Sequence, residues 1–198
     1  MLKILTVCTG NICRSPLAAL VLRDRLSALP VTVESAGTRA RDGAPVTVET
    51  VMLAEQFGVD RGAASAHRSR RLRPEHLADA DLVLAMSREH RRAVVEMDPS
   101  RVRNCFTIRE FDRLAASLSD MDPLRLADAP HDIHARLEHV VSAVASQRGL
   151  LLPPADPDAD DVLDPYGRSI STYARSARQL APSLLVVERI LRVVSSSV

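Results

Sequence analysis

The sequence predicts an α/β fold, a three-layer sandwich in which a central, mostly parallel four-stranded sheet is flanked by helices. Short apolar runs alternate with segments of helical periodicity along the chain, which is typical of strand–helix–strand units. The first apolar run passes through a short polar loop directly into a helical pattern. The 198 residues are 46% hydrophobic and contain no long apolar run, so we expect one globular domain with a sizeable core.

Each predicted element follows from a local pattern. Apolar runs predict four strands, at Leu2–Val7, Val31–Ser35, Asp81–Met86 and, shorter, Val102–Phe106. Between and after them, helical spacing of apolar residues predicts three helices, at Ser15–Leu29, Val46–Phe57 and Ser87–Glu96. Ligands of such sheets bind at the carboxyl ends of the strands, so we expect a site where the first strand ends.

The pattern changes after Phe111. Residues 112–160 are rich in proline and are predicted to form an inserted segment with one helix, at Asp132–Gln147. A Pro- and Asp-rich stretch, Leu152–Asp161, is predicted to be a mobile loop. A final helix is expected at Ser171–Val194, either continuous or interrupted at Pro182. Residues 1–198 are therefore predicted to form a single domain with an insert at about 112–160.

The loop after the first strand carries the clearest chemical signal. Its sequence, Val-Cys-Thr-Gly-Asn-Ile-Cys-Arg-Ser-Pro, places Cys8 six positions before Arg14 and ends where a helix begins. Free N–H groups and the dipole at a helix N-terminus favour a bound anion and favour thiolate over thiol at Cys8. The planar guanidinium of Arg14 can hold two oxygens of a phosphate. Gly10 permits a close backbone approach, and the small polar residues around it can orient the loop, namely Thr9, Asn11 and Ser15.

Other loop motifs do not fit this string. It has no Gly-x-Gly-x-x-Gly for a dinucleotide and no Gly-Lys-Ser/Thr for a nucleoside triphosphate. Four residues separate Cys8 from Cys13, so the Cys-x-x-Cys spacing of redox and zinc motifs is missing. The loop is therefore interpreted as a phosphate-binding loop that carries its own nucleophile.

The full string resembles the signature of the low-molecular-weight protein tyrosine phosphatases. This resemblance implies a phosphatase I-like fold and hydrolysis of phosphotyrosine in proteins through a cysteinyl-phosphate. It implies that Cys8 is the nucleophile and Arg14 the phosphate clamp. The phosphate-binding loop would comprise, besides these two, Thr9, Gly10, Asn11, Ile12, Cys13 and Ser15. Ser15 could also donate a hydrogen bond to the thiolate sulfur.

A phosphatase of this kind needs an acid, because an expelled alkoxide or phenolate leaves far better when it receives a proton. Asp164, in Asp-Pro-Tyr, matches the general-acid loop of the same family, and Tyr166 would lie beside the cleft. Three other carboxylates precede it, at Asp158, Asp160 and Asp161, but they lack the Pro-Tyr context. Asp164 is therefore the predicted general acid and base.

Two further stretches resemble the family, Ser-Ala-Gly-Thr from Ser35 and His-Arg-Ser-Arg from His67. The resemblance implies a hydrogen-bond network that holds the phosphate loop, formed by Asn11, Ser15, Ser35 and His67. It also gives Cys13 a possible role as partner of Cys8 in a reversible protective disulfide, with simple packing as the alternative. Cys105 lies in a strand pattern and is expected in the core.

The chain departs from the family in the walls of its cleft. Many relatives carry an aromatic residue on the loop that here is Arg39–Gly43, and here Gly167 follows Asp-Pro-Tyr in place of a second tyrosine. Ile12 and Tyr166 would be the apolar walls. In these respects the chain looks most similar to the bacterial, polysaccharide-associated branch, whose partners are autophosphorylated tyrosine kinases.

Composition narrows the setting. No signal peptide is evident and three cysteines fit a reducing compartment, so a cytoplasmic location is expected. Aromatic content of 3% and a net charge of +1 do not suggest nucleic-acid binding, and no membrane segment is expected. We expect no metal or other cofactor, since the helix terminus and Arg14 supply positive charge.

Two alternatives remain open. A thiol-dependent arsenate reductase would use a similar loop, but it needs further cysteines near the site, for which the nearest candidate is Cys105. A non-catalytic phosphate-binding or regulatory module would not need Cys8, Arg14 and Asp164 together. Hydrolysis of an aryl phosphate separates these possibilities.

Overall fold

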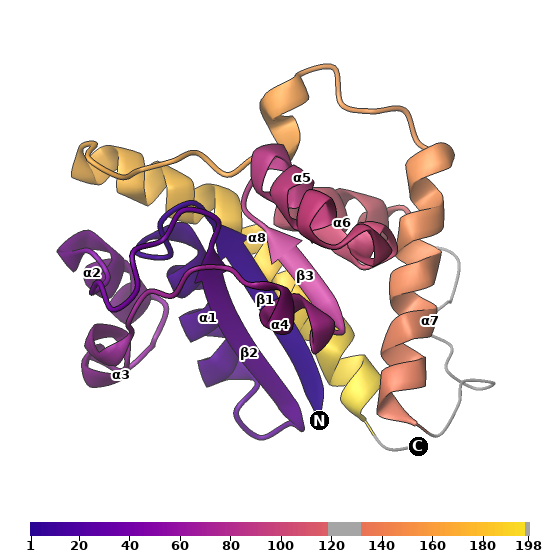
Figure 1. The fold of residues 1–198 in the computed structure, drawn as a ribbon, viewed down its shortest axis with the longest axis horizontal. Coiled ribbons are helices and arrows are strands. Elements are labelled where there is room, and N and C mark those ends of the chain that lie inside the picture. The colour runs from indigo at the N-terminus through magenta and orange to yellow at the C-terminus, as the bar shows by residue number, and fades with distance from the viewer. Residues whose placement is uncertain (119–131, 197–198) are drawn as a thin grey trace.

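Four parallel strands form the centre of the protein. The computed structural model describes residues 1–118 and 132–196. Its strands are β1 (Leu2–Cys8), β2 (Val31–Gly37), β3 (Leu82–Ala85) and β4 (Cys105–Thr107), in the order β2-β1-β3-β4 (Figure 1). Every neighbouring pair is parallel, and Cys8 at the end of β1 lies opposite Gly37. The predicted sheet is confirmed, and its carboxyl edge holds the candidate nucleophile.

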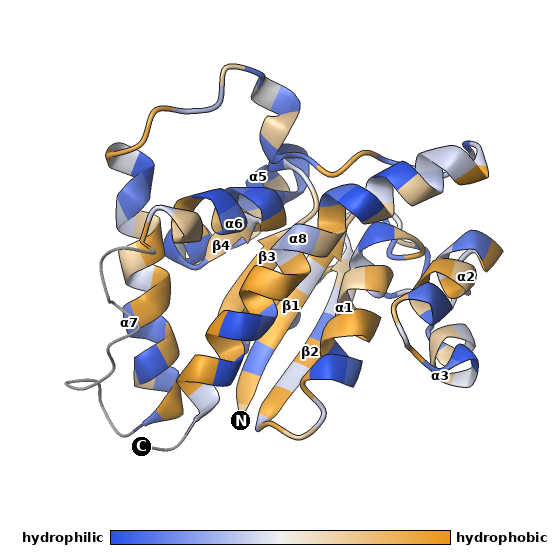
Figure 2. Cartoon of the chain, turned by 180° about the vertical axis from the view of Figure 1, so that it is seen from behind, coloured by the Kyte–Doolittle hydropathy of each residue, from blue (hydrophilic) through white to orange (hydrophobic). Residues whose placement is uncertain are grey.

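Helices cover both faces of the sheet. One face packs against α1 (Arg14–Arg25) and α8 (Ile170–Ser195), whose hydrophobic residues lie along the strands in Figure 2. The other face packs against α4 (Pro74–Ala78) and α5 (Arg88–Met97). The three-layer arrangement explains why all of β3 and all of β1 except Lys3 are buried, since a parallel sheet is covered on both faces.

The predicted helices around the first half of the sheet exist with shifted ends. α1 ends at Arg25, four residues before the predicted end, and α2 occupies Val48–Gln56 after the capping residue Thr47, whose side chain accepts from the Thr50 N–H. Two short helices were not predicted, α3 (Arg61–Ala66) and α4. Both are too short for periodicity to reveal them.

The fourth strand begins three residues later than predicted. Pro99–Arg103 form a short 3₁₀ helix, η1, which starts at Asp98. The Asp98 carboxylate accepts hydrogen bonds from the backbone N–H and hydroxyl of Ser100, at 3.0 and 2.6 Å. This local cap therefore prevails over the strand preference of Val102, and the sequence prediction for Val102–Phe106 was wrong at its first half.

A regular helix that the sequence analysis did not predict crosses Phe111, after which the insert is expected to begin. α6 (Ile108–Ala116) begins directly after β4 with a capping box: Thr107 accepts from the Glu110 N–H, and Glu110 accepts from the Thr107 N–H. After it come α7 (Ile133–Ser146), η3 (Gln147–Gly149) and η4 (Pro157–Asp160). Part of the predicted insert, residues 119–131, lies outside the described residues.

α8 runs without interruption through Pro182. One face of it is buried from Tyr173 to Val194 against α1, α6 and α7, and next to the proline Ser183 donates a hydrogen bond to the Asp112 carboxylate at 2.9 Å. Within the described residues, neither this helix nor any other is long and apolar enough to cross a membrane.

Candidate active site

The loop between β1 and α1 folds back over the end of β2. Asn11 adopts a positive φ of 54°, and the backbone N–H groups of Thr38 and Arg39 donate to the carbonyls of Cys8 and Thr9, both at 2.9 Å. A Cβ on Gly37 would lie 2.5 Å from the Thr9 carbonyl oxygen and 2.9 Å from the Asn11 nitrogen. The close backbone approach that shapes this loop therefore depends on Gly37.

Two donors point at the sulfur of Cys8, which is only 2% exposed. The Ser15 hydroxyl donates to Cys8 Sγ at 3.0 Å, and the Asn11 backbone N–H donates at 3.2 Å. Ser15 Oγ itself accepts from Asn11 Nδ2 at 3.0 Å, so its own proton is free to face the sulfur. Both hydrogen bonds stabilise negative charge on Cys8, as the sequence predicts for Ser15.

A second layer of contacts fixes Asn11. His67 Nε2 lies 3.1 Å from the Asn11 carbonyl oxygen, and the Arg70 backbone N–H donates to Asn11 Oδ1 at 2.9 Å. Burial lowers the pKa of His67, so the neutral ring must carry its proton on Nε2 to donate to that carbonyl.

Ser35 is adjacent to this network without joining it through its side chain. Its buried hydroxyl has no hydrogen-bond partner among the described residues, while its carbonyl accepts from Arg70 Nε at 2.8 Å. Of the four residues expected in the supporting network, the structure links Asn11, Ser15 and His67, and the Ser35 side chain stays outside.

Arg14, the first residue of α1, is buried beneath the loop with only 6% of its surface exposed. Its Nη2 forms an ion pair with Asp164 Oδ2 at 2.7 Å, and its Nη1 donates to the Val162 carbonyl at 3.1 Å. Its Nε is buried and has no hydrogen-bond partner in the described part of the chain. A buried guanidinium N–H without a partner is costly, and here it is available to an oxyanion.

Asp164 reaches Arg14 from a part of the chain 150 positions away in sequence. Its other oxygen, Oδ1, accepts from the Tyr166 backbone N–H at 3.2 Å, which holds the Asp-Pro-Tyr turn closed. The rival carboxylates are engaged elsewhere: Asp158 and Asp161 pair with Arg88, and Asp160 pairs with Arg113. Of these four acids, only Asp164 lines the cavity that contains Cys8.

That cavity, of about 350 Å³, opens at the carboxyl end of β1. Its apolar walls are Ile12, Ala44 and the exposed ring of Tyr166, and Arg39 and Arg41 stand along it as well. The full lining consists of Cys8, Thr9, Gly10, Ile12, Cys13, Arg14, Arg39, Arg41, Ala44, Asp164 and Tyr166. Most of the predicted loop and both predicted walls therefore meet in one place.

The two other cysteines have different surroundings. Cys13 lies at the start of α1, where its Sγ is 3.5 Å from the Tyr173 hydroxyl and 3.8 Å from Thr47 Oγ1, and burial raises the pKa of its thiol. Cys105 is fully buried in β4, and burial raises its pKa to about 12. All three cysteines are free thiols. Cys105 belongs to the core cluster on the other face of the sheet from Cys8.

His90 is a residue at this site that the sequence did not reveal. It is 2% exposed, with Nε2 at 2.8 Å from Thr9 Oγ1 and Nδ1 at 2.8 Å from Ser87 Oγ. Burial, and secondly the charge of Arg14, lower its pKa to about 4. Ser87 also caps α5, so the serine three positions before His90 was a visible helix-start signal, but nothing local indicated the contact with Thr9.

Comparisons with known proteins agree with this geometry. Residues 3–153 match the family model of the low molecular weight phosphotyrosine protein phosphatases. A protein-arginine-phosphatase of Geobacillus stearothermophilus is 41% identical over 110 residues, which are 55% of this chain and 70% of that protein. A probable low molecular weight protein-tyrosine-phosphatase, EpsP, of Ralstonia solanacearum is 37% identical over 110 residues, which are 56% of this chain and 72% of that protein.

Solved structures give the same result over nearly the whole chain. A low molecular weight protein tyrosine phosphatase from T. tengcongensis matches with a TM-score of 0.66 and 30% identity, covering 96% of this chain and 99% of the other. The arginine phosphatase of Geobacillus stearothermophilus matches with a TM-score of 0.66 and 28% identity, and the match covers 97% of this chain and 94% of that one. The chain belongs to the low molecular weight phosphotyrosine protein phosphatase family.

Proposed function

We propose that this protein hydrolyses phosphotyrosine in protein substrates through a cysteinyl-phosphate intermediate. The observation that carries the proposal is one cavity of about 350 Å³ that Cys8, Arg14 and Asp164 line together. These groups supply a nucleophile, an oxyanion clamp and a proton donor within one cleft.

In the first step, Arg14 and the loop N–H groups bind the phosphate dianion, and Arg14 exchanges the Asp164 carboxylate for phosphate oxygens. The released carboxylate, now beside a dianion, takes up a proton from solvent. Cys8 Sγ attacks phosphorus, the bond from phosphorus to the phenolic oxygen breaks, and Asp164 transfers its proton to that oxygen. The positive charge at the phosphoryl group comes from Arg14 and the N-terminus of α1.

In the second step, Asp164 accepts a proton from water while the water oxygen attacks phosphorus. The sulfur–phosphorus bond breaks and its electron pair returns to Cys8 Sγ, which gives inorganic phosphate and the thiolate. The hydrogen bonds from Ser15 and Asn11 to this sulfur stabilise it as a leaving group.

Phosphoarginine is the second candidate substrate, because one relative is named a protein-arginine-phosphatase. The cavity walls favour phosphotyrosine. Ile12 and Tyr166 provide apolar surface for a phenyl ring, and Arg39 and Arg41 repel the positive charge of a substrate guanidinium. The one carboxylate in the lining, Asp164, is already paired with Arg14.

Two peptides of identical sequence, one with phosphotyrosine and one with phosphoarginine, test this assignment. We expect kcat/KM to be at least about tenfold higher for phosphotyrosine, equivalent to about 1.4 kcal/mol of transition-state discrimination. Cys8→Ser is expected to abolish turnover of both while inorganic phosphate still binds, measured by calorimetry. A preference for phosphoarginine would reject the substrate assignment, and full activity of Cys8→Ser would reject the mechanism.

We further infer that the protein acts in the cytoplasm on a phosphorylated protein such as a bacterial tyrosine kinase. Three unpaired thiols, one of them the nucleophile, support a reducing compartment. The relative EpsP is a probable tyrosine phosphatase, which supports a phosphotyrosine protein as partner. A Cys8→Ser variant used as a substrate trap should retain a tyrosine-phosphorylated protein that free aryl phosphate displaces.

A further inference from the structure

We propose that Arg113 and Asp160 are positioning residues for the general acid, because their ion pair fixes the segment that ends in Asp164. The inference rests on the proposed role of Asp164. Neither Arg113 nor Asp160 lines the cavity with Cys8, so their contribution to the reaction passes through the position of the loop.

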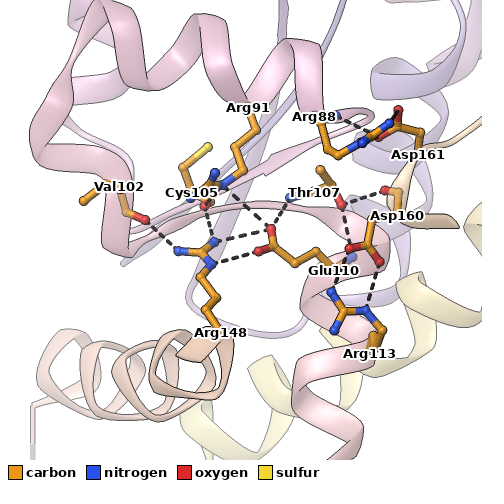
Figure 3. A network of polar contacts seen from close by, with 10 residues as sticks. All are labelled: Arg88, Arg91, Val102, Cys105, Thr107, Glu110, Arg113, Arg148, Asp160 and Asp161. Carbon is orange, nitrogen blue, oxygen red and sulfur yellow. Dashed lines mark hydrogen bonds and ion pairs between the residues drawn. The ribbon is translucent and has the colours of Figure 1, made fainter. Parts of the chain in front are cut away.

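The ion pair has the geometry of a strong, directional contact. Arg113, on α6, donates through Nε to Asp160 Oδ1 at 3.0 Å and through Nη2 to Oδ2 at 2.7 Å (Figure 3). The Asp160 side chain is only 12% exposed and that of Arg113 33%. A two-pronged, partly buried arginine–carboxylate pair fixes orientation as well as distance.

The backbone of Asp160 is held by Thr107, the last residue of β4 and the cap of α6. The Thr107 hydroxyl donates to the Asp160 carbonyl at 2.7 Å, inside the protein. Thr107 Oγ1 also accepts from the Glu110 N–H at 3.0 Å, so its own proton is directed at Asp160. The residue that begins α6 therefore holds the acid segment at the same time.

The base of this arrangement is rigid. The Glu110 carboxylate accepts a hydrogen bond from Arg148 Nε at 2.8 Å. Arg148 also donates to the carbonyls of Val102 and Cys105, both at 2.7 Å. Arg91 lies 3.7 Å from the same carboxylate (Figure 3). These contacts tie the first turn of α6 to β4 and α5, so Arg113 projects from a fixed support.

Between Asp160 and Asp164 each residue is fixed to a different element. Asp161 accepts from the Arg88 N–H at 2.8 Å, the Val162 N–H donates to the Met86 carbonyl at 2.8 Å, and the Leu163 N–H donates to Gln179 at 2.9 Å. The Arg113–Asp160 pair is therefore the first of a short series of contacts that together hold the segment ending in Asp164.

Earlier in the chain, Leu150 and Leu152 are 74% and 90% exposed, although they are apolar. The Arg113–Asp160 pair and the Arg88–Asp158 pair lie between this exposed stretch and Asp164. The first pair also lines a cavity of about 560 Å³ together with Leu151 and Pro153. General-acid catalysis requires the donor within roughly 0.5 Å of its working position, so these contacts bear directly on the rate.

The test uses the rate of leaving-group release in the first turnover, measured by stopped flow with aryl phosphates of graded leaving-group pKa. Proton donation matters for a poor leaving group such as phenol and hardly at all for 2,4-dinitrophenol. We expect Arg113→Gln and Asp160→Asn to lower the rate with phenyl phosphate by about tenfold and with 2,4-dinitrophenyl phosphate by less than about twofold.

Arg101→Gln is the matched control. It removes another partly buried arginine–aspartate pair, with Arg101 Nε 2.9 Å from Asp98 Oδ2, at the opposite end of the sheet from Asp164. This variant should leave both rates unchanged. Thr107→Val, which removes the other contact with Asp160, should repeat the selective loss, and thermal melting identifies any variant that does not fold.

Equal losses with both substrates, or none with either, would overturn the positioning role. Asp164→Ala separates this result from a failure of the proposed function. If Asp164→Ala shows the steep leaving-group dependence and Arg113→Gln and Asp160→Asn do not, only the positioning inference fails. If Asp164→Ala itself shows no such dependence, Asp164 is not the acid and both proposals fall.

Discussion

His90 connects the phosphate loop with α5 through the Thr9 hydroxyl. Because Arg14 Nη2 can only donate to Thr9 Oγ1, at 3.5 Å, the ring of His90 decides where the proton of that hydroxyl points. Burial lowers the pKa of His90 to about 4, so the ring is neutral at pH 7 and is part of the scaffold around Arg14.

Replacement of His90 by asparagine tests this scaffold. We expect His90→Asn to raise the inhibition constant of inorganic phosphate and the KM of an aryl phosphate by about threefold to tenfold, because Thr9 and Arg14 lose a fixed partner. His139→Asn, at an exposed position of α7, is the control and should change neither constant. Unchanged phosphate inhibition in His90→Asn would show that the contact does not position the clamp.

At this scale local patterns predicted the contacts that are close in the chain, whereas the distant residues His67 and Asp164 were predicted only through the family resemblance. Cys8, Asn11, Arg14 and Ser15 lie within eight positions, so strand–loop–helix geometry alone brings them together. The contact between Thr9 and His90 spans 81 positions and depends on how β3 and α5 pack, which no local pattern encodes. The roles of the site residues stay predictions that the proposed experiments address.

At the scale of elements, the capping residues decided where the sequence predictions failed. Asp98 caps η1 at residues that were expected to begin a strand. Thr107 caps α6, a helix that continues past Phe111 into the region expected to be an insert. These capping hydrogen bonds are local, but the spacing of apolar residues does not show whether they are stronger than strand pairing. The longer elements, β1 and α8, matched closely because many buried positions support each of them.

Pro182 shows the opposite balance. A proline inside a helix removes one backbone hydrogen bond and costs about 3 kcal/mol. α8 nevertheless continues, since ten of its residues are buried against neighbouring helices and the sheet. Tertiary packing therefore outweighs the local penalty, which is why the sequence left both possibilities open.

Arg148 joins the end of α7 to β4 and α6, and its removal should loosen that junction. Arg148→Gln leaves Glu110, whose side chain is 14% exposed, with Arg91 at 3.7 Å as its nearest cation. We expect a loss of about 1–3 kcal/mol in the free energy of unfolding, measured with urea. Arg92→Gln removes an exposed pair with Glu96 and should lower the free energy of unfolding much less than Arg148→Gln does. Equal effects would contradict a structural role for Arg148.

For the whole molecule, the buried imidazole of His90 and the half-buried imidazole of His67 make stability depend on pH. Burial lowers the pKa of both His90 and His67 in the folded protein. Below about pH 6.5 the unfolded chain binds protons that the folded protein does not, so stability falls as pH decreases. Above about pH 7 both states are neutral and this contribution is complete.

Urea unfolding between pH 7.5 and 4.5 measures this dependence. The pKa of His90 is about 4 in the folded protein and about 6.5 in the unfolded chain. This difference alone predicts that the free energy of unfolding falls by up to about 3 kcal/mol as the pH falls to 4. In His90→Asn the slope of stability against pH should be smaller, whatever its stability at pH 7.5. Parallel slopes for the two proteins would show that His90 is not the group responsible.

The single-domain organisation remains a prediction, but the whole fold explains how distant segments share one site. Parallel strands all end at the same edge, so β1 delivers the loop with Cys8 there, and the chain that follows α7 crosses that edge before it enters α8 (Figure 1). The sequence could predict this edge from the strand–helix alternation.

The ion pair between Arg14 and Asp164 places a carboxylate of the protein itself on the guanidinium that is proposed to bind phosphate. In the proposed mechanism this carboxylate takes the place of one phosphate oxygen, so it competes with the dianion that binds Arg14. Once the sulfur–phosphorus bond is broken and Asp164 has lost its proton to solvent, its return to Arg14 would favour departure of the product. We therefore expect weak inhibition by inorganic phosphate, because Asp164 competes with phosphate for Arg14.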